Sequence, residues 1–166
     1  MNKINDLACA VPTLELAAAF IWQEAELLDG KRYEEWSALW SADGLYVIPI
    51  DPDTTDFEAT LNYAHDDARM RAMRIERLTS GHSVSAVDAA RTVRTVSRFA
   101  VVEAAEDVIE VRSAQILVAY KREVQTLFAA DLTHRLRMTP AGLRMDQKVV
   151  RLINSTDALH ALGFLL

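Results

Sequence analysis

The chain has 166 residues, of which 51% are hydrophobic, and its formal net charge at pH 7 is -6. This length allows a substantial core, and no linker rich in Pro, Gly or Ser divides residues 1–166, so we expect a single domain. An acidic chain lacks the basic face that neutralises phosphates, which argues against a nucleic-acid partner. The longest apolar run, Leu16–Trp22, is too short to cross a bilayer, and one cysteine, Cys9, allows no internal disulfide. We therefore expect a cytoplasmic protein without a membrane anchor.

Helical spacing dominates the first half of the chain. Capping residues and breaks in the apolar pattern predict helix 12–30, helix 33–44, strand 45–50, strand 57–63 and helix 66–80. The second of these helices carries Tyr33, Trp36 and Trp40 on one face. Aromatic side chains remove large areas from water, so this face is expected to close over a concave apolar surface.

Long strands dominate the second half. Alternating apolar and polar residues predict them at 92–102, 108–121, 124–137 and 143–154. In the first, Arg94 and Arg98 are expected on the outward face, opposite Val93. Helices followed by a meander of long strands predict an α+β fold, in which the N-terminal helices pack on a strongly curved antiparallel sheet.

Several segments, in this order and spacing, resemble the small (β) subunit of the Rieske-type aromatic ring-hydroxylating dioxygenases. The segments are Leu27–Ile50, Asp66-Asp67, Arg74–Gly81, Arg91-Thr92, Val96-Ser97, Val111–Ser113 and a final strand that ends at Asn154. The resemblance covers nearly the whole chain and implies the cone-shaped, cystatin-like fold of the nuclear transport factor 2-like superfamily. The chain departs from the family pattern at Arg94 and Arg98, where His and Asn are usual, and near Leu143, where a Trp is usual.

The resemblance also implies that a different subunit carries the redox centres. In such dioxygenases a separate α subunit carries the Rieske iron–sulfur cluster and the mononuclear iron, and the β subunit is mainly structural within a hetero-hexamer. A chain with one cysteine cannot supply the two Cys and two His ligands of a Rieske centre. We therefore expect no cofactor or metal in this chain, a dioxygenase α subunit as its partner, and self-association as a trimer or dimer.

His134 is the residue most able to carry chemistry in this chain. It lies between Leu132 and Leu136 on the apolar face of its strand and is expected to point toward the space between sheet and helices. A neutral core histidine is the favoured interpretation. The alternative is a proton-transfer group with Asp43 and Tyr46, as in the similar ketosteroid isomerases and scytalone dehydratases, which would make the chain a stand-alone isomerase or dehydratase for a small apolar substrate.

The other histidines give weaker signals. His65 with Asp66 and Asp67 contains part of a facial iron triad, but adjacent residues point in different directions, so a helix N-cap is favoured. His82 and His160 have no recognisable ligand spacing.

Two groups of residues are candidate contact surfaces. Four arginines, Arg69, Arg71, Arg74 and Arg77, follow one helix and predict either a solvated face or a docking face for an acidic partner. The second group comprises the outward arginines and the apolar tail, which would promote association if left in water. Its members are Arg94, Arg98, Phe164, Leu165 and Leu166.

Overall fold

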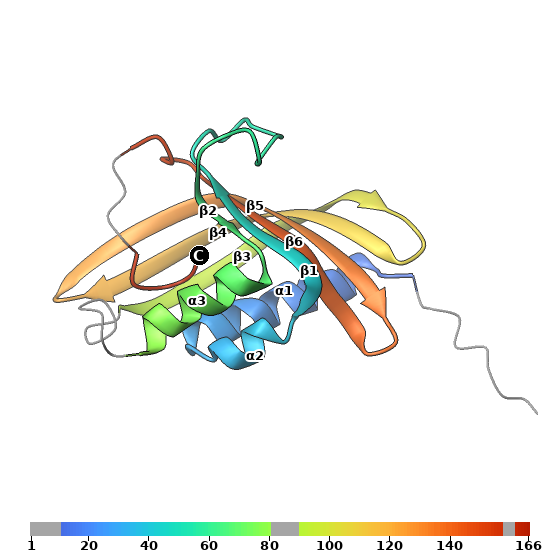
Figure 1. The fold of residues 1–166 in the computed structure, drawn as a ribbon, viewed down its shortest axis with the longest axis horizontal. Coiled ribbons are helices and arrows are strands. Elements are labelled where there is room, and N and C mark those ends of the chain that lie inside the picture. The colour runs from blue at the N-terminus through green and yellow to red at the C-terminus, as the bar shows by residue number, and fades with distance from the viewer. Residues whose placement is uncertain (1–10, 81–89, 158–161) are drawn as a thin grey trace, which may run out of the picture.

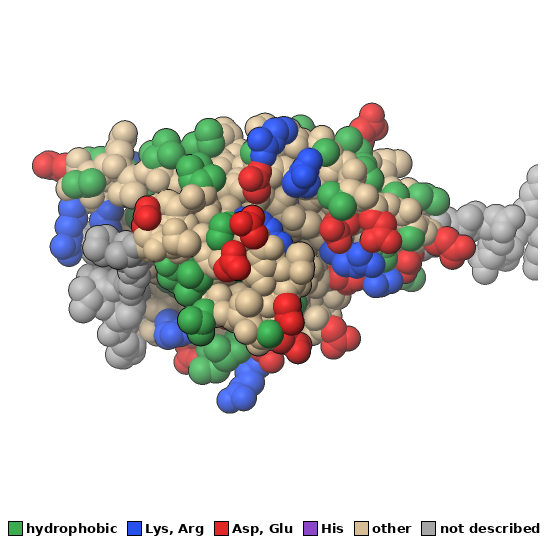
Figure 2. All heavy atoms as spheres, turned by 90° about the horizontal axis from the view of Figure 1, so that it is seen from above, with side chains coloured by type: hydrophobic (Ala, Val, Ile, Leu, Met, Phe, Trp, Pro, Cys, Tyr) green, Lys and Arg blue, Asp and Glu red, His purple; other side chains and the backbone are tan. Residues whose placement is uncertain are grey.

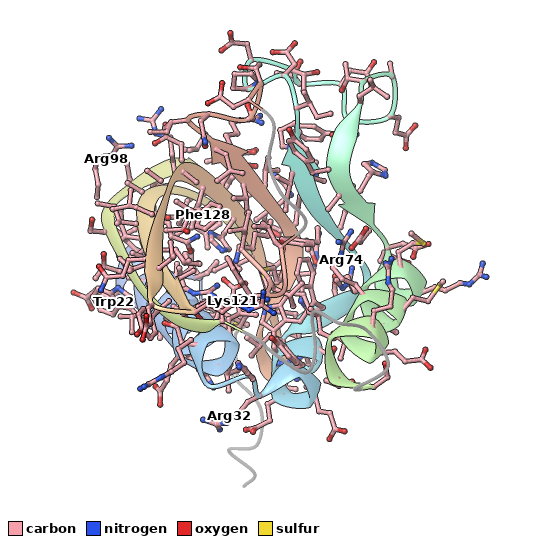
Figure 3. All side chains as sticks on the ribbon, turned by 90° about the vertical axis from the view of Figure 1, so that its left-hand side faces the viewer. Trp22, Arg32, Arg74, Arg98, Lys121 and Phe128 are labelled. Carbon is pink, nitrogen blue, oxygen red and sulfur yellow. The ribbon has the colours of Figure 1, made fainter. Side chains whose placement is uncertain are left out.

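The computed structural model describes residues 11–80, 90–157 and 162–166, and helices precede most of the strands. The elements within these residues are α1 (Leu14–Asp29), α2 (Tyr33–Ser37), β1 (Trp40–Pro49), β2 (Asn62–Asp66), α3 (Ala68–Thr79), β3 (Arg91–Ala104), β4 (Val108–Lys121), β5 (Val124–Thr139) and β6 (Gly142–Leu152). Figures 1 and 3 show the helices side by side beneath one face of the sheet. The predicted α+β class, with helices packed on a sheet, is confirmed.

The strands form one open sheet in the order β2-β1-β6-β5-β4-β3. Four of its neighbouring pairs are antiparallel, as expected from the sequence, and one pair, β1 with β6, runs parallel. The parallel pair arises because β6 follows a long excursion through β2, α3 and three further strands. Strands β2 and β3 form the two edges, and the strong curvature expected from the sequence stays a prediction.

Helices α1 and α3 begin at the residues that the capping pattern favours. The Thr13 hydroxyl accepts a hydrogen bond from the Leu16 N–H at 3.3 Å, and the Asp67 carboxylate accepts one from the Met70 N–H at 2.8 Å. Each such cap stabilises a helix by about 1 kcal/mol. Asp66, expected within the helix, instead ends β2, so the N-cap interpretation holds for Asp67.

The second helix is shorter than predicted, because the chain enters the sheet earlier. Helix α2 ends at Ser37 and Trp40 opens β1, where it pairs with Met145 of β6. Gly44, expected to end the helix, lies inside the strand: a Cβ there would come within 2.7 Å of the Met145 carbonyl oxygen. Glycine thus permits the close approach of β1 to β6.

An aromatic cluster does form over the sheet, but it joins Trp36 and Trp40 of the expected set with Tyr46, and its members come from a helix and a strand. Trp36 of α2 contacts Trp40 and Tyr46 of β1 edge to face, with ring centroids 5.3 Å and 6.0 Å away. Trp36 is completely buried. These contacts fix α2 against the sheet.

The short strand predicted over 57–63 begins later, at Asn62. Side chains hold the preceding loop in turns: the Thr60 hydroxyl donates to the Asp56 carbonyl at 2.7 Å, and the Asn62 amide donates to the Phe57 carbonyl at 2.7 Å. Such local bonds compete with strand pairing.

In the first half of β3, the residues that point inward and outward are the reverse of those predicted. Val93 is 68% exposed, whereas Arg94 is 7% exposed and lies inward with Val96. A bulge between Ser97 and Ala100 then shifts the register, and Arg98 adopts a φ of 58°. Arg98 does point outward, as Figure 3 shows, and pairs with Asp131. The outward orientation expected for Arg94 is therefore wrong, and that of Arg98 is confirmed.

The apolar tail, Leu162–Leu166, packs against its own chain. Leu165 and Leu166 are 3% and 1% exposed and belong to the core. Phe164 is half-buried, with its ring 5.6 Å from that of Phe128 in β5. Figure 1 shows the C end beneath the sheet. Leu165 and Leu166 are buried between the sheet and the helices, so they cannot form the contact surface expected from the sequence.

Candidate functional site

One row of side chains across the sheet brings several buried polar groups together. The pairing register places Val111, His134, Lys148, Tyr46 and Asp66 side by side on β4, β5, β6, β1 and β2. All five are buried, each with at most 1% of its surface exposed. Residues paired directly across strands face the same side of a sheet, so this row points toward the helices.

Glu24 of α1 lies over this row and joins it together. Its Oε1 accepts hydrogen bonds from Lys148 Nζ at 2.7 Å and from Trp36 Nε1 at 3.0 Å. Its Oε2 lies 3.0 Å from His134 Nε2. We call Glu24, His134, Lys148 and Tyr46 the buried cluster.

The charges of the buried cluster follow from competition between burial and pairing. Burial by itself raises the pKa of Glu24, but the charge of Lys148 and the hydrogen bond with His134 outweigh it and lower the pKa below its usual value. Burial lowers the pKa of His134 and of Lys148, against the opposing effect of Glu24. We therefore assign a carboxylate–ammonium pair and a neutral imidazole whose Nε2–H donates to Glu24. His134 Nδ1 then has no partner among the described residues.

The tail is bound to the same cluster by its main chain. The Leu166 oxygen accepts hydrogen bonds from Lys148 Nζ at 2.9 Å and from the Tyr46 hydroxyl at 3.1 Å. The Leu166 N–H donates to that hydroxyl, also at 3.1 Å. Burial raises the pKa of Tyr46, so its hydroxyl remains protonated at neutral pH.

Arg94 adds a second ion pair beside the cluster. Its Nε donates to Asp29 at 2.8 Å, and its Nη2 donates to the Leu165 oxygen at 3.1 Å. Asp29 also accepts from the Arg94 main-chain N–H at 2.8 Å. A counter-charge at the end of α1 thus explains why an arginine on β3 can face inward.

The arginines of α3 do not form one solvated face. Arg74 binds Asp66 in a bidentate pair, with the Nη2–Oδ1 distance at 3.0 Å. Arg71 is 5% exposed, stacks 4.1 Å over the Trp40 ring and donates to the Gly44 carbonyl. Figure 3 shows Arg74 between α3 and the neighbouring strands. Two of the four arginines therefore fix α3 to the sheet, and an acidic partner could reach only the rest.

The residues proposed from the sequence for proton transfer are only partly brought together. His134 points inward, as predicted, and shares its row with Tyr46, but Asp43 is exposed at the surface. The carboxylate beside His134 is Glu24, which was not among the site residues predicted from the sequence. Its spacing gave a usable signal, because Glu24 is three residues after Ile21 and four before Leu28, on the buried stripe of α1.

Metal binding finds no support in the described part of the chain. Among residues 11–80, 90–157 and 162–166, no group of three or more His, Cys, Asp or Glu side chains converges as a metal site. His65 has a half-buried side chain, while Asp66 is occupied by Arg74. Cys9, His82 and His160 lie outside the described residues. No described helix is long and apolar enough to cross a membrane.

Comparison with known proteins decides the family. The family model described as "Ring hydroxylating beta subunit" matches residues 23–157. The benzene 1,2-dioxygenase subunit beta of Pseudomonas putida is 33% identical over 157 residues, which cover 87% of this chain and 84% of that protein. The chain belongs to the ring-hydroxylating β-subunit family.

Solved structures agree on the fold of this family member. The β subunit of the benzoate 1,2-dioxygenase from Burkholderia mallei superimposes with a TM-score of 0.78 and 19% identity, over 94% of this chain and 99% of that one. An NTF2-like protein with a cystatin-like fold from Novosphingobium aromaticivorans gives a TM-score of 0.61 and 18% identity, over 84% and 81% of the two chains. The nuclear transport factor 2-like fold predicted from the sequence is confirmed.

Proposed function

We propose that this chain is the β subunit of an aromatic ring-hydroxylating dioxygenase and that its role is assembly. The observation that carries the proposal is the family match over residues 23–157, together with 33% identity to a benzene 1,2-dioxygenase β subunit. The buried cluster supports a structural role, because Glu24 is held by three donors and Lys148 by two acceptors within the chain. Such mutual pairing fixes helices to a sheet.

The redox chemistry of the complex belongs, in this proposal, to a separate α subunit. That subunit would hold the iron–sulfur cluster and the mononuclear iron, since one cysteine cannot ligate a Rieske centre. The β subunit would act in the cytoplasm as a folded platform for the α subunit, as one domain over residues 1–166.

We also propose that the chain self-associates, as a trimer or dimer alone and within a hetero-hexamer. Support comes from the outer face of the sheet, where Val93, Val118 and Leu127 lie in one cross-strand row. Val93 and Leu127 are 68% and 63% exposed. Figure 2, seen from above, has groups of hydrophobic side chains among charges of both signs. Apolar residues gathered on an exposed face favour a protein contact.

Co-expression with the α subunit of the same system tests the main proposal. Size-exclusion chromatography with light scattering is expected to give a stable hetero-oligomer, and iron analysis is expected to find metal only when the α subunit is present. Leu127→Asp should weaken self-association because it places a charge in the apolar row. Leu61→Asp is the matched control, since Leu61 is 79% exposed outside the sheet strands. A monomer that never co-elutes with the α subunit would refute the proposal.

A stand-alone isomerase or dehydratase is the second candidate function. The observation that favours it is the buried Glu24–His134 pair, 3.0 Å apart, which resembles the acid–base pairs of proton-transfer sites. The pair needs a substrate within reach, however, and the neighbouring donors Tyr46 and Lys148 are bound to Leu166. Turnover by the assembled complex that carries His134→Gln separates the two candidates.

A further inference from the structure

Strand β3 forms the longer of the two edges of the sheet. It extends over 14 residues, Arg91–Ala104, whereas β2 at the opposite edge has 5 residues. The edge of a sheet presents main-chain N–H and C=O groups to which another strand can add. Identical edges can pair antiparallel about a two-fold axis, so the strand best suited to add to β3 is the β3 strand of a second copy of this chain.

The sequence of β3 favours such addition. Val93, Val101 and Val102 are 68%, 46% and 57% exposed. The segment Phe99–Val102 is a run of four apolar residues without a charge. β-branched and aromatic residues have a high strand propensity, and uncharged apolar runs at an edge promote pairing between chains. The edge therefore stays unpaired only if something blocks strand addition.

Side chains of α1 occupy main-chain groups on the outer side of β3. The Arg94 N–H donates to the Asp29 carboxylate at 2.8 Å, and the Val96 oxygen accepts a hydrogen bond from Trp22 Nε1 at 2.9 Å. Residues two apart in an antiparallel strand direct their main-chain groups to the same side. Because the Arg94 N–H binds Asp29, that side is the one that faces away from β4.

The Trp22 ring also occupies the space that an incoming strand would need. Neighbouring strands lie about 4.8 Å apart, whereas the indole nitrogen is 2.9 Å from the Val96 oxygen. The ring contacts Phe99 edge to face, with the centroids 5.4 Å apart, and this contact holds it in place although the residue is 55% exposed. Figure 3 shows Trp22 beside the edge of the sheet.

Beyond Val96 the strand itself distorts the edge. The pairing register with β4 shifts between Ser97 and Ala100 and again before Glu103. Bulges of this kind interrupt the row of main-chain groups and twist an edge away from a partner. The regular stretch that remains is Thr92–Val96, and the two contacts from α1 lie within it.

We propose that α1 caps the β3 edge and thereby prevents a second copy of the chain from adding its β3 strand there. Trp22 is the residue that blocks addition, and Asp29 supplies the second cap. This inference goes beyond the proposed assembly function, because it concerns a surface that the chain withholds from association. It depends neither on the α subunit nor on the outer face of the sheet.

Trp22→Ala tests the proposal in the full chain that also carries Leu127→Asp, so that contact through the outer face is weakened in both proteins compared. Removing the indole frees the Val96 oxygen and the space beside it. The dissociation constant of a dimer, measured by sedimentation equilibrium, is expected to fall at least about tenfold, because each dimer gains two main-chain hydrogen bonds. Tyr63→Ala is the matched control, since the partly exposed Tyr63 also donates to a main-chain oxygen, that of Ser155, at 2.8 Å.

A second change in β3 identifies the surface that associates. Thr95 is exposed and lies within the capped stretch. Adding Thr95→Lys to Trp22→Ala brings like charges together in a β3–β3 pair and should return the dissociation constant to its starting value. An unchanged dissociation constant for Trp22→Ala, an equal change for Tyr63→Ala, or association that Thr95→Lys does not reverse would each overturn the proposal.

Amide hydrogen exchange, measured by NMR on the unchanged protein, tests the Asp29 cap directly. The Arg94 N–H is expected to exchange at least about tenfold more slowly than the Val96 N–H on the same side of the strand, because a hydrogen bond to a charged group protects it. Equal exchange rates at the two positions would contradict capping by Asp29.

If circular dichroism shows that Trp22→Ala does not fold, Trp22→Leu takes its place. Leucine keeps an apolar contact with Phe99 but removes the indole donor and most of the ring. The dissociation constant should then still fall about fivefold, the usual effect of one neutral hydrogen bond, and an unchanged value would overturn the proposal.

Discussion

Replacing Lys148 by methionine tests whether the buried cluster holds the helices on the sheet. The Lys148 and Glu24 side chains are 1% and 2% exposed and their charged atoms are 2.7 Å apart. Methionine keeps much of the side-chain length but removes the charge, so Glu24 would be left with a negative charge and without its cationic partner. The carboxylate would retain only its contacts with Trp36 and His134.

The expected loss is large, because a buried charge is left without its partner. Removing one member of a buried ion pair typically lowers the free energy of unfolding by about 3–5 kcal/mol. In a domain of this size each kcal/mol shifts the melting temperature by roughly 2–4 °C, so a decrease of roughly 6–20 °C is expected. The double variant Glu24→Gln/Lys148→Met should recover about 2 kcal/mol relative to the sum of the single changes.

Chemical and thermal unfolding of the single and double variants measures these values. Arg32→Met is the control, because Arg32 and Glu35 are joined at a similar distance, 2.6 Å, but are 49% and 58% exposed. Water screens such a pair, so its loss should leave the melting temperature unchanged within error. If Lys148→Met melted at the same temperature as Arg32→Met, or if the single changes were simply additive, the structural role assigned to the cluster would be wrong.

Three further predictions concern histidine and metal chemistry. His134→Gln is expected to leave turnover of the assembled oxygenase close to normal, whereas loss of a general base would lower the rate about a hundredfold or more. His65→Gln is the control. Abolished turnover with intact assembly would support the isomerase or dehydratase alternative. The free energy of unfolding should fall as the pH decreases from about 7 to 5, by at most about 1.4 kcal/mol per pH unit. Burial keeps the pKa of His134 below the ordinary histidine value of 6.5, so the unfolded chain takes up the proton first. His134→Gln should flatten this pH profile, and an unchanged slope would contradict the assignment of a neutral imidazole. The purified chain is expected to bind no stoichiometric iron or zinc, and about one tightly held metal per chain in elemental analysis would contradict this.

Much of the architecture followed from the sequence because local patterns control it. The Thr13 cap and the apolar stripe of α1 determined the first helix, and period-two alternation located the four long strands. The inward position of His134 followed from its place between Leu132 and Leu136. These inferences need only neighbours along the chain.

The tertiary structure decided which face of a strand is buried and which charges meet. Alternation in β3 allows either Val93 or Arg94 to face inward, and Asp29 of α1 determines the outcome by supplying a counter-charge. The end of α2 is likewise fixed by pairing of Trp40 with Met145, more than a hundred residues later.

The candidate site depended most on tertiary structure. Periodicity placed His134 on the inner face, but not beside Glu24, which is 110 residues away in sequence. Hydropathy could not tell whether Leu165 and Leu166 contact a partner or pack in the core of their own chain, because either arrangement removes the same apolar area from water. The fold decided it, because Tyr46, Lys148 and Arg94 provide donors for the main-chain oxygens of Leu165 and Leu166 at the place where these leucines enter the core.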